Sequence, residues 1–125
     1  MNRLVAESYL FLIRIEMLMS FGDFQSIHEL LRNRKLAETA QRGTPAVDQI
    51  CHAMDMACVF YPKRVLCLQR AAATTLLLRR HGWRAETVIG AQLLPFRSHA
   101  WVELDGIVVN DKPYMLEIYQ SLERC

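Results

Sequence analysis

Apolar residues recur at spacings of three and four through the first half of the chain, which is the periodicity of amphipathic helices. Three helices are predicted: Leu4–Met19, Phe24–Arg34 and a third from Thr44-Pro45 to about Phe60. Thr44 suits the N-cap of the third helix, and Pro45 suits its first turn. The first helix is apolar on more than one side, so it either packs into the core or faces a membrane surface or a partner.

The next predicted element is an alanine- and leucine-rich helix over Cys67–Arg80, where most residues have high helix propensity. It follows the connector Tyr61-Pro62-Lys63, and Gly82 suits the position just beyond its C-cap. The three consecutive alanines Ala71-Ala72-Ala73 allow another element to approach closely. We therefore expect this helix at the centre of the fold, with a cysteine at its start.

After Gly82 the pattern changes to the period of about 2 that is typical of strands. The predicted strands are Arg84–Gly90, His99–Leu104 and Ile107–Asn110, with Leu93–Phe96 as the first connector, Asp105-Gly106 as a hairpin turn, and Lys112–Cys125 as a final strand or a short helix. The fold class is therefore α+β. N-terminal helices are followed by a small antiparallel sheet that packs on the central helix bearing the cysteine.

Length and composition describe one globular domain of 125 residues, 52% hydrophobic and 22% charged. Within it, residues 1–45 are expected to form a helical N-terminal extension and residues 46–125 the core. The net charge of +2 is too small to indicate a nucleic-acid partner. Basic residues gather at Arg32–Lys35 and at Arg79-Arg80-His81, and we interpret each group as a solvated helix end.

The four cysteines include no CxxC pair, and the chain shows no secretory signal, so we expect free thiols in a reducing, cytoplasmic setting. The apolar run Tyr9–Met19 is too short to span a bilayer and contains Arg14 and Glu16, so no membrane partner is expected. The cysteines and the adjacent His52 lack the spacing of a zinc site, so no metal is expected either.

A cysteine at a helix start and a histidine on a strand are the two main parts of a nucleophilic cysteine site. The unpaired N–H groups and the dipole at a helix start stabilise a thiolate at Cys67, and the same N–H groups can hold an oxyanion. His99 would exchange a proton with the thiol. The alternative is that both are packed core residues, which is the commoner role of a lone cysteine or histidine.

The third member of such a site depends on the register of the hairpin. If Asp105-Gly106 forms a two-residue turn, Asn110 shares a face with His99. If Gly106 instead forms a bulge that ends a three-residue loop, Asp111 becomes the neighbour of His99. The residues by themselves leave both registers open.

Two other polar residues lie near these positions in the chain. Glu103 is on the same strand face as His99 but about 13 Å further along, so we expect that it does not orient the imidazole. Gln69 lies about one turn into the central helix and could bind a substrate carbonyl, although we expect it to face solvent.

Four blocks of residues, in this order, resemble a known family: Arg64-Val65-Leu66-Cys67-Leu68-x-Arg70-Ala71, Leu77-Leu78-Arg79-Arg80-His81-Gly82, Val88-Ile89-Gly90 and His99-Ala100-Trp101-Val102-Glu103-Leu104-Asp105-Gly106. The chain is similar to the lasso peptide biosynthesis B protein. This family is a transglutaminase-like cysteine protease that removes the leader from a ribosomally made precursor peptide. The resemblance spans about Val47–Asp111 and depends on the order of the blocks.

The resemblance implies a transglutaminase/papain-like fold and a triad of Cys67, His99 and Asp111, without a cofactor, and it favours the bulged register. It also implies a stand-alone leader peptidase that works with a separate leader-recognition protein, because residues 1–45 are helical and too short for the strand-rich recognition module. The lasso cyclase is a candidate further partner. The alternatives are a non-catalytic peptide-binding scaffold of the same fold and an amide-forming or deamidating transglutaminase.

Overall fold

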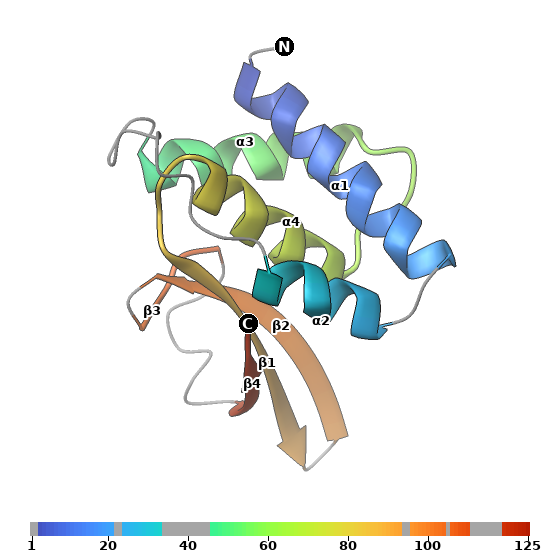
Figure 1. Ribbon diagram of the computed structural model, residues 1–125, viewed down its shortest axis with the longest axis vertical. Coiled ribbons are helices and arrows are strands. Elements are labelled where there is room, and N and C mark those ends of the chain that lie inside the picture. The colour runs from blue at the N-terminus through green and yellow to red at the C-terminus, as the bar shows by residue number, and fades with distance from the viewer. Residues whose placement is uncertain (1–2, 22–23, 34–45, 94–95, 105, 111–118) are drawn as a thin grey trace.

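The computed structural model describes residues 3–21, 24–33, 46–93, 96–104, 106–110 and 119–125 (Figure 1). Its elements follow the order α1 (Arg3–Phe21), α2 (Phe24–Asn33), α3 (Val47–Phe60), α4 (Cys67–Arg80), β1 (Ala85–Leu93), β2 (Phe96–Leu104), β3 (Ile107–Val108) and β4 (Gln120–Arg124). Helices precede strands, and the strands form one antiparallel sheet, so the predicted α+β class is confirmed.

The predicted cap of α3 is wrong. The N-cap residue is Ala46, and the helix starts at Val47; Thr44 and Pro45 lie outside the described residues. The side chain of Gln49 explains this start, because its Oε1 accepts a hydrogen bond of 3.0 Å from the backbone N–H of Ala46. This bond satisfies the N–H of the N-cap residue itself, whereas a capping threonine would accept from an N–H inside the first turn.

Helix α4 lies at the centre of the fold, as predicted, between the other helices and the sheet (Figure 1). Every residue from Ala71 to Leu78 is buried. The α1 side chains of Leu12 and Ile15 are fully buried in the same core. One face of α1 therefore packs on the domain, while Leu10 and Met17 on another face stay more than half exposed.

The sheet has the strand order β3-β2-β1-β4, and all neighbours are antiparallel. Strands β1 and β2 are longer than predicted, because Leu93 and Phe96 pair with each other as strand residues instead of forming a connector. Of the two predictions for Lys112–Cys125, the strand is confirmed over Gln120–Arg124: this strand, β4, hydrogen-bonds to the edge of β1. A strand at this edge satisfies backbone groups that would otherwise face solvent unpaired.

The bulged hairpin register, which the family resemblance favours, is wrong. Leu104 pairs with Ile107, which is the register of the two-residue alternative. Gly106 has a φ of +82°, a conformation that side-chain-bearing residues rarely adopt. Glycine at position 106 therefore permits the tight connection between β2 and β3 without a bulge.

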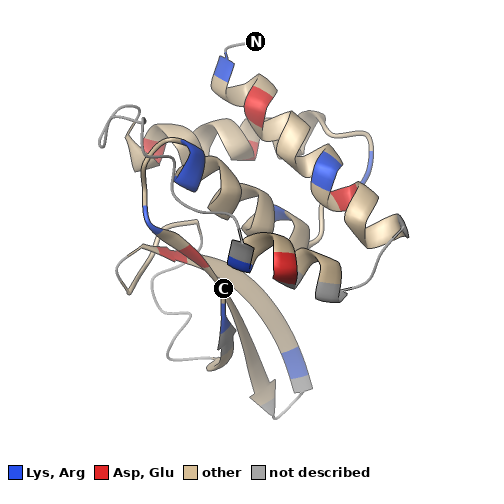
Figure 2. Ribbon diagram, viewed as in Figure 1, with Lys and Arg blue, Asp and Glu red and all other residues tan. Residues whose placement is uncertain are grey.

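The basic end of α4 is solvated only in part: Arg80 is exposed, as predicted, but Arg79 is not. Arg79 is partly buried and donates hydrogen bonds to three backbone carbonyls, those of Leu31 in α2, Ala85 in β1 and Cys125 after β4. A guanidinium with its fixed fork of donors can serve several carbonyls at once. Arg79 therefore links the helical layer to the sheet. Elsewhere, Figure 2 shows basic and acidic residues interspersed over helices and sheet, as the small net charge implies.

Candidate active site

Cys67 is the first residue of α4, and it is exposed to solvent. The N-cap residue Leu66 makes no side-chain cap hydrogen bond, and the first helical bond runs from the N–H of Arg70 to the Leu66 carbonyl at 2.9 Å. The earlier N–H groups of the turn therefore have no acceptor within the helix. An anion at Cys67, or an oxyanion beside it, would meet the positive end of the helix dipole.

Cys67 opens onto a cleft of about 260 Å³ between the start of α4 and the sheet. Its lining residues come from three elements: Cys67 and Leu68 from α4, Ile89 from β1, and Ser98, His99 and Ala100 from β2. The two residues predicted to carry the chemistry therefore lie on the same cleft. Most of the wall is apolar, which suits a peptide backbone held beside a few polar groups.

The ring of His99 packs against two other aromatic side chains. Its centroid lies 6.2 Å from that of Trp101, nearly parallel at 27°, and 5.6 Å from that of Tyr119. Because strand side chains alternate, this ring is on the opposite face of β2 from Ala100 and Val102, which pack toward α4. His99 nonetheless lines the same cleft as Cys67.

The predicted third member, Asp111, lies outside the described residues. Asn110, the alternative, is described, and its Oδ1 accepts a hydrogen bond of 2.7 Å from the backbone N–H of Val102. Val102 is three residues from His99, or about 10 Å along the strand. The side-chain oxygen of Asn110 thus binds the backbone of β2 at Val102 and not the imidazole of His99.

The two cysteines of α3 are less exposed than Cys67. Burial, reinforced by the nearby carboxylate of Asp55, raises the pKa of the Cys51 thiol to about 11. Burial also raises the pKa of Cys58. Both thiols therefore stay protonated at neutral pH, which leaves them poor nucleophiles.

The two expectations for Gln69 are both wrong. Its side chain is 2% exposed, and its Nε2 donates a hydrogen bond of 3.0 Å to the backbone carbonyl of Leu12 in α1. The residue points away from solvent into the helical layer. It fixes α1 to α4 and does not face the cleft.

Sequence reasoning missed a network on the outer face of the sheet, near His99. Glu103 is 2% exposed; its Oε2 accepts a bond of 2.8 Å from Nε1 of Trp101, and its Oε1 accepts one of 2.6 Å from Arg124. Glu103 is indeed too far along β2 to touch His99, but Trp101 lies between them. The alternation of His99, Trp101 and Glu103 on one strand face was the signal that could have revealed it.

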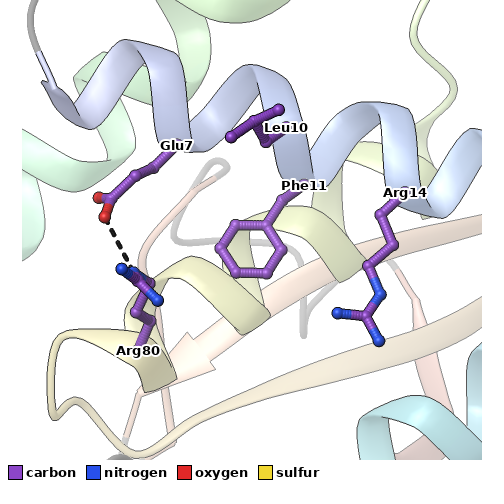
Figure 3. A pocket seen from close by; sticks show the side chains of 5 residues that line it. All are labelled: Glu7, Leu10, Phe11, Arg14 and Arg80. Atoms are coloured by element: carbon purple, nitrogen blue, oxygen red, sulfur yellow. Dashed lines mark hydrogen bonds and ion pairs between the residues drawn. The ribbon is translucent and has the colours of Figure 1, made fainter.

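A second cavity, also of about 260 Å³, lies between α1 and the end of α4. Figure 3 shows the ring of Phe11 in its middle, between Arg14 and the hydrogen-bonded pair of Glu7 and Arg80. This cavity is at the other end of α4 from Cys67. The side chains described there include no cysteine or histidine, so it is not the candidate for nucleophilic chemistry.

Neither a metal cluster nor a membrane-spanning helix is found in the described part of the chain. Over these residues, no three side chains of His, Cys, Asp or Glu gather closely enough to hold a metal ion. No described helix combines the length and the apolar character needed to cross a bilayer.

Comparison with known proteins gives one curated relative and one family model. A 49-residue segment is 43% identical to the microcin J25-processing protein McjB of Escherichia coli, and it covers 39% of this chain and 24% of that relative. The chain thus matches about a quarter of the relative's length. No solved structure gives a significant match. The model of the transglutaminase-like superfamily matches residues 9–124, from within α1 to the end of β4, and the chain belongs to this superfamily.

Proposed function

We propose that this protein is a cysteine protease that removes the leader from a ribosomally synthesised lasso precursor peptide. The observation that carries the proposal is the exposed thiol of Cys67 at the uncapped start of α4, on a cleft shared with His99. The similarity to a protein named for processing microcin J25 supports the same substrate class. The proposal accounts both for the order of the four sequence blocks and for the arrangement of Cys67 and His99 on one cleft.

The proposed reaction proceeds through a thioester. The Cys67 thiolate adds to the carbonyl carbon at the leader–core junction, and the N–H groups at the start of α4 stabilise the resulting oxyanion. Protonated His99 gives its proton to the departing amine of the core as the peptide bond breaks. Water then adds to the thioester, His99 takes a proton from it, and the leader leaves as a carboxylic acid while Cys67 is regenerated. Asp111, the acid that the family resemblance implies, is proposed to orient the imidazole, because the side-chain oxygen of Asn110 already accepts a hydrogen bond from the backbone N–H of Val102.

The chemistry requires no cofactor, since a thiolate, an acid–base group and N–H donors complete it. We propose that the chain acts as one domain in the cytoplasm, with residues 1–45 as a helical extension of the core at 46–125. A separate leader-recognition protein would deliver the precursor, and the lasso cyclase would use the freed amine.

The test is cleavage of the precursor in the presence of its recognition protein, followed by mass spectrometry. Cys67→Ala should abolish the release of leader and core, and His99→Ala should reduce it by at least about 100-fold. Cys51→Ala, which removes a thiol that stays protonated, is the matched control and should cleave like the wild type. Unchanged cleavage by Cys67→Ala would refute the proposal.

The same reactions separate the alternatives and the third residue. A non-catalytic scaffold would bind the peptide without changing its mass, and a transglutaminase would change its mass without breaking a peptide bond. Asp111→Ala should lose most activity. Asn110→Ala should retain much of it, because the Asn110 side chain serves the backbone of Val102.

A further inference from the structure

We propose that Trp101 and Tyr119 are positioning residues that hold the imidazole of His99, and that Glu103 and Arg124 fix Trp101 in place. This inference rests on the proposed role of His99 as acid and base. It assigns a task to four side chains on the outer face of the sheet, none of which is among the residues that line the cleft.

The first step is the packing of the three rings. Trp101 and Tyr119 each lie against His99, and their own centroids are 5.9 Å apart. These distances and tilts are typical of favourable aromatic pairs. An imidazole enclosed on two sides has fewer orientations than one on an open strand, so its nitrogens keep a constant direction.

The second step is the anchoring of the indole. Trp101 is fully buried, and its N–H donates to the buried carboxylate of Glu103. Arg124 in β4 binds the other oxygen of that carboxylate, so the contact reaches from β4 to β2 across β1. Val88 in β1 explains the alignment, because it pairs with Trp101 on one side and with Arg124 on the other.

The third step is the space that the rings need. Gly90 pairs with His99 across β1 and β2. A Cβ at position 90 would lie 2.5 Å from Cη2 of Trp101 and 2.9 Å from Cβ of Tyr119. Glycine thus allows both aromatic side chains to close over β1 beside the histidine.

A buried network of this kind could also serve stability alone. Kinetic measurements distinguish that role from the positioning of His99. Proton transfer needs the donor and acceptor in hydrogen-bond reach, and a misplacement of about 1 Å can reduce the rate about 100-fold. If the network positions His99, loosening it lowers kcat and leaves KM nearly unchanged, because peptide contacts remain.

The test measures kcat and KM for precursor cleavage in three variants of the network. Trp101→Phe removes the indole N–H, and Tyr119→Leu removes one of the rings against His99. Arg124→Met removes the charge at the outer end, and Arg124→Lys serves as the conservative rescue. Arg84→Met, the same change at an exposed position before β1, is the matched control. Unfolding midpoints and circular dichroism accompany each variant.

We expect kcat to fall about 10- to 100-fold in Trp101→Phe and Tyr119→Leu, and about 10-fold in Arg124→Met, with KM within twofold. Arg124→Lys should recover most of the loss, and Arg84→Met should show none. If the buried tryptophan variant fails to fold, Arg124→Met decides, since that side chain is 44% exposed. Unchanged kcat in a folded Arg124→Met or Tyr119→Leu protein would overturn the positioning role.

An NMR measurement separates this inference from the proposed function. Nuclear Overhauser contacts between the ring protons of His99 and Tyr119 should be present in the wild type and weaker in Arg124→Met. If those contacts behave so but the wild type cleaves no precursor, the positioning stands and the protease proposal fails. If the wild type cleaves and the contacts are absent, the protease proposal stands and the positioning fails.

Discussion

Gln69 in α4 donates a buried hydrogen bond of 3.0 Å to the backbone carbonyl of Leu12 in α1. The two residues are 57 positions apart, so the bond ties the first helix to the helix that carries Cys67. Because Leu12 is itself fully buried, the amide of Gln69 has no water to replace its partner. The N-terminal helix α1 is therefore joined to α4 through the interior of the protein.

Replacing Gln69 should destabilise the fold without changing substrate affinity. Gln69→Ala removes the hydrogen bond and leaves a cavity, so we expect the free energy of unfolding to fall by about 2–4 kcal/mol. Gln69→Met keeps most of the volume and should lose only about 1–2 kcal/mol. Urea unfolding measures both. A large rise in KM at full stability would instead indicate a substrate contact.

Glu7 should make the stability of the protein depend on pH in the acidic range. Burial by itself would raise the pKa of Glu7, but hydrogen bonds from His81 and Arg80 outweigh it and lower the pKa below its usual value. A carboxylate with a depressed folded-state pKa stabilises the fold above its unfolded value of about 4.3, and this contribution is lost as the pH falls through the folded-state pKa.

Glu7→Gln should therefore be less stable than the wild type at pH 7, and the difference should shrink as the pH falls below about 4. Urea unfolding at pH 7, 5 and 3.5 gives the comparison. Glu29→Gln in the exposed part of α2 is the control and should follow the wild type at each pH. A difference between Glu7→Gln and wild type that stays constant with pH would contradict the assignment.

Gly90→Ala should be destabilising for steric reasons. The added methyl would overlap Trp101 at 2.5 Å, so one of the rings or the backbone must move, at a cost of about 1–3 kcal/mol. Gly106→Ala is the contrasting variant: no atom lies within 4 Å of the new Cβ, and only its positive φ opposes the change, at about 1 kcal/mol. Thermal unfolding distinguishes them, and cleavage should fall only in Gly90→Ala.

Alkylation should single out Cys67. With a pKa of about 11, only about one Cys51 thiol in a thousand is ionised at pH 8, and it is also half-buried. Iodoacetamide should therefore modify the exposed Cys67 well before Cys51 or Cys58, as read by peptide mapping at several times. Cys67→Ser should remove the fast phase. Labelling of Cys51 at the same rate would show that the helix start confers no advantage.

Much of the fold could be predicted because its signals are local. Periodic apolar residues located α1, α2 and α4, and the change to period two located β1 and β2. The same local logic identified Cys67 at a helix start, since the proline-containing connector before it interrupts the helical pattern. These features depend on neighbours a few positions away, so the sequence determined them without reference to the rest of the molecule.

The remaining features were decided by contacts between residues far apart in the chain. Gln69 is buried only because α1 covers it, and Arg79 is occupied only because three separate segments bring carbonyls to it. By sequence position, Glu103 is too far from His99 to contact it, and only the structure shows that Trp101 and Arg124 bind its two carboxylate oxygens. A one-dimensional pattern shows the face on which a polar side chain lies, but its partner is set by packing, because a buried polar group must bond to whatever the tertiary structure brings within reach.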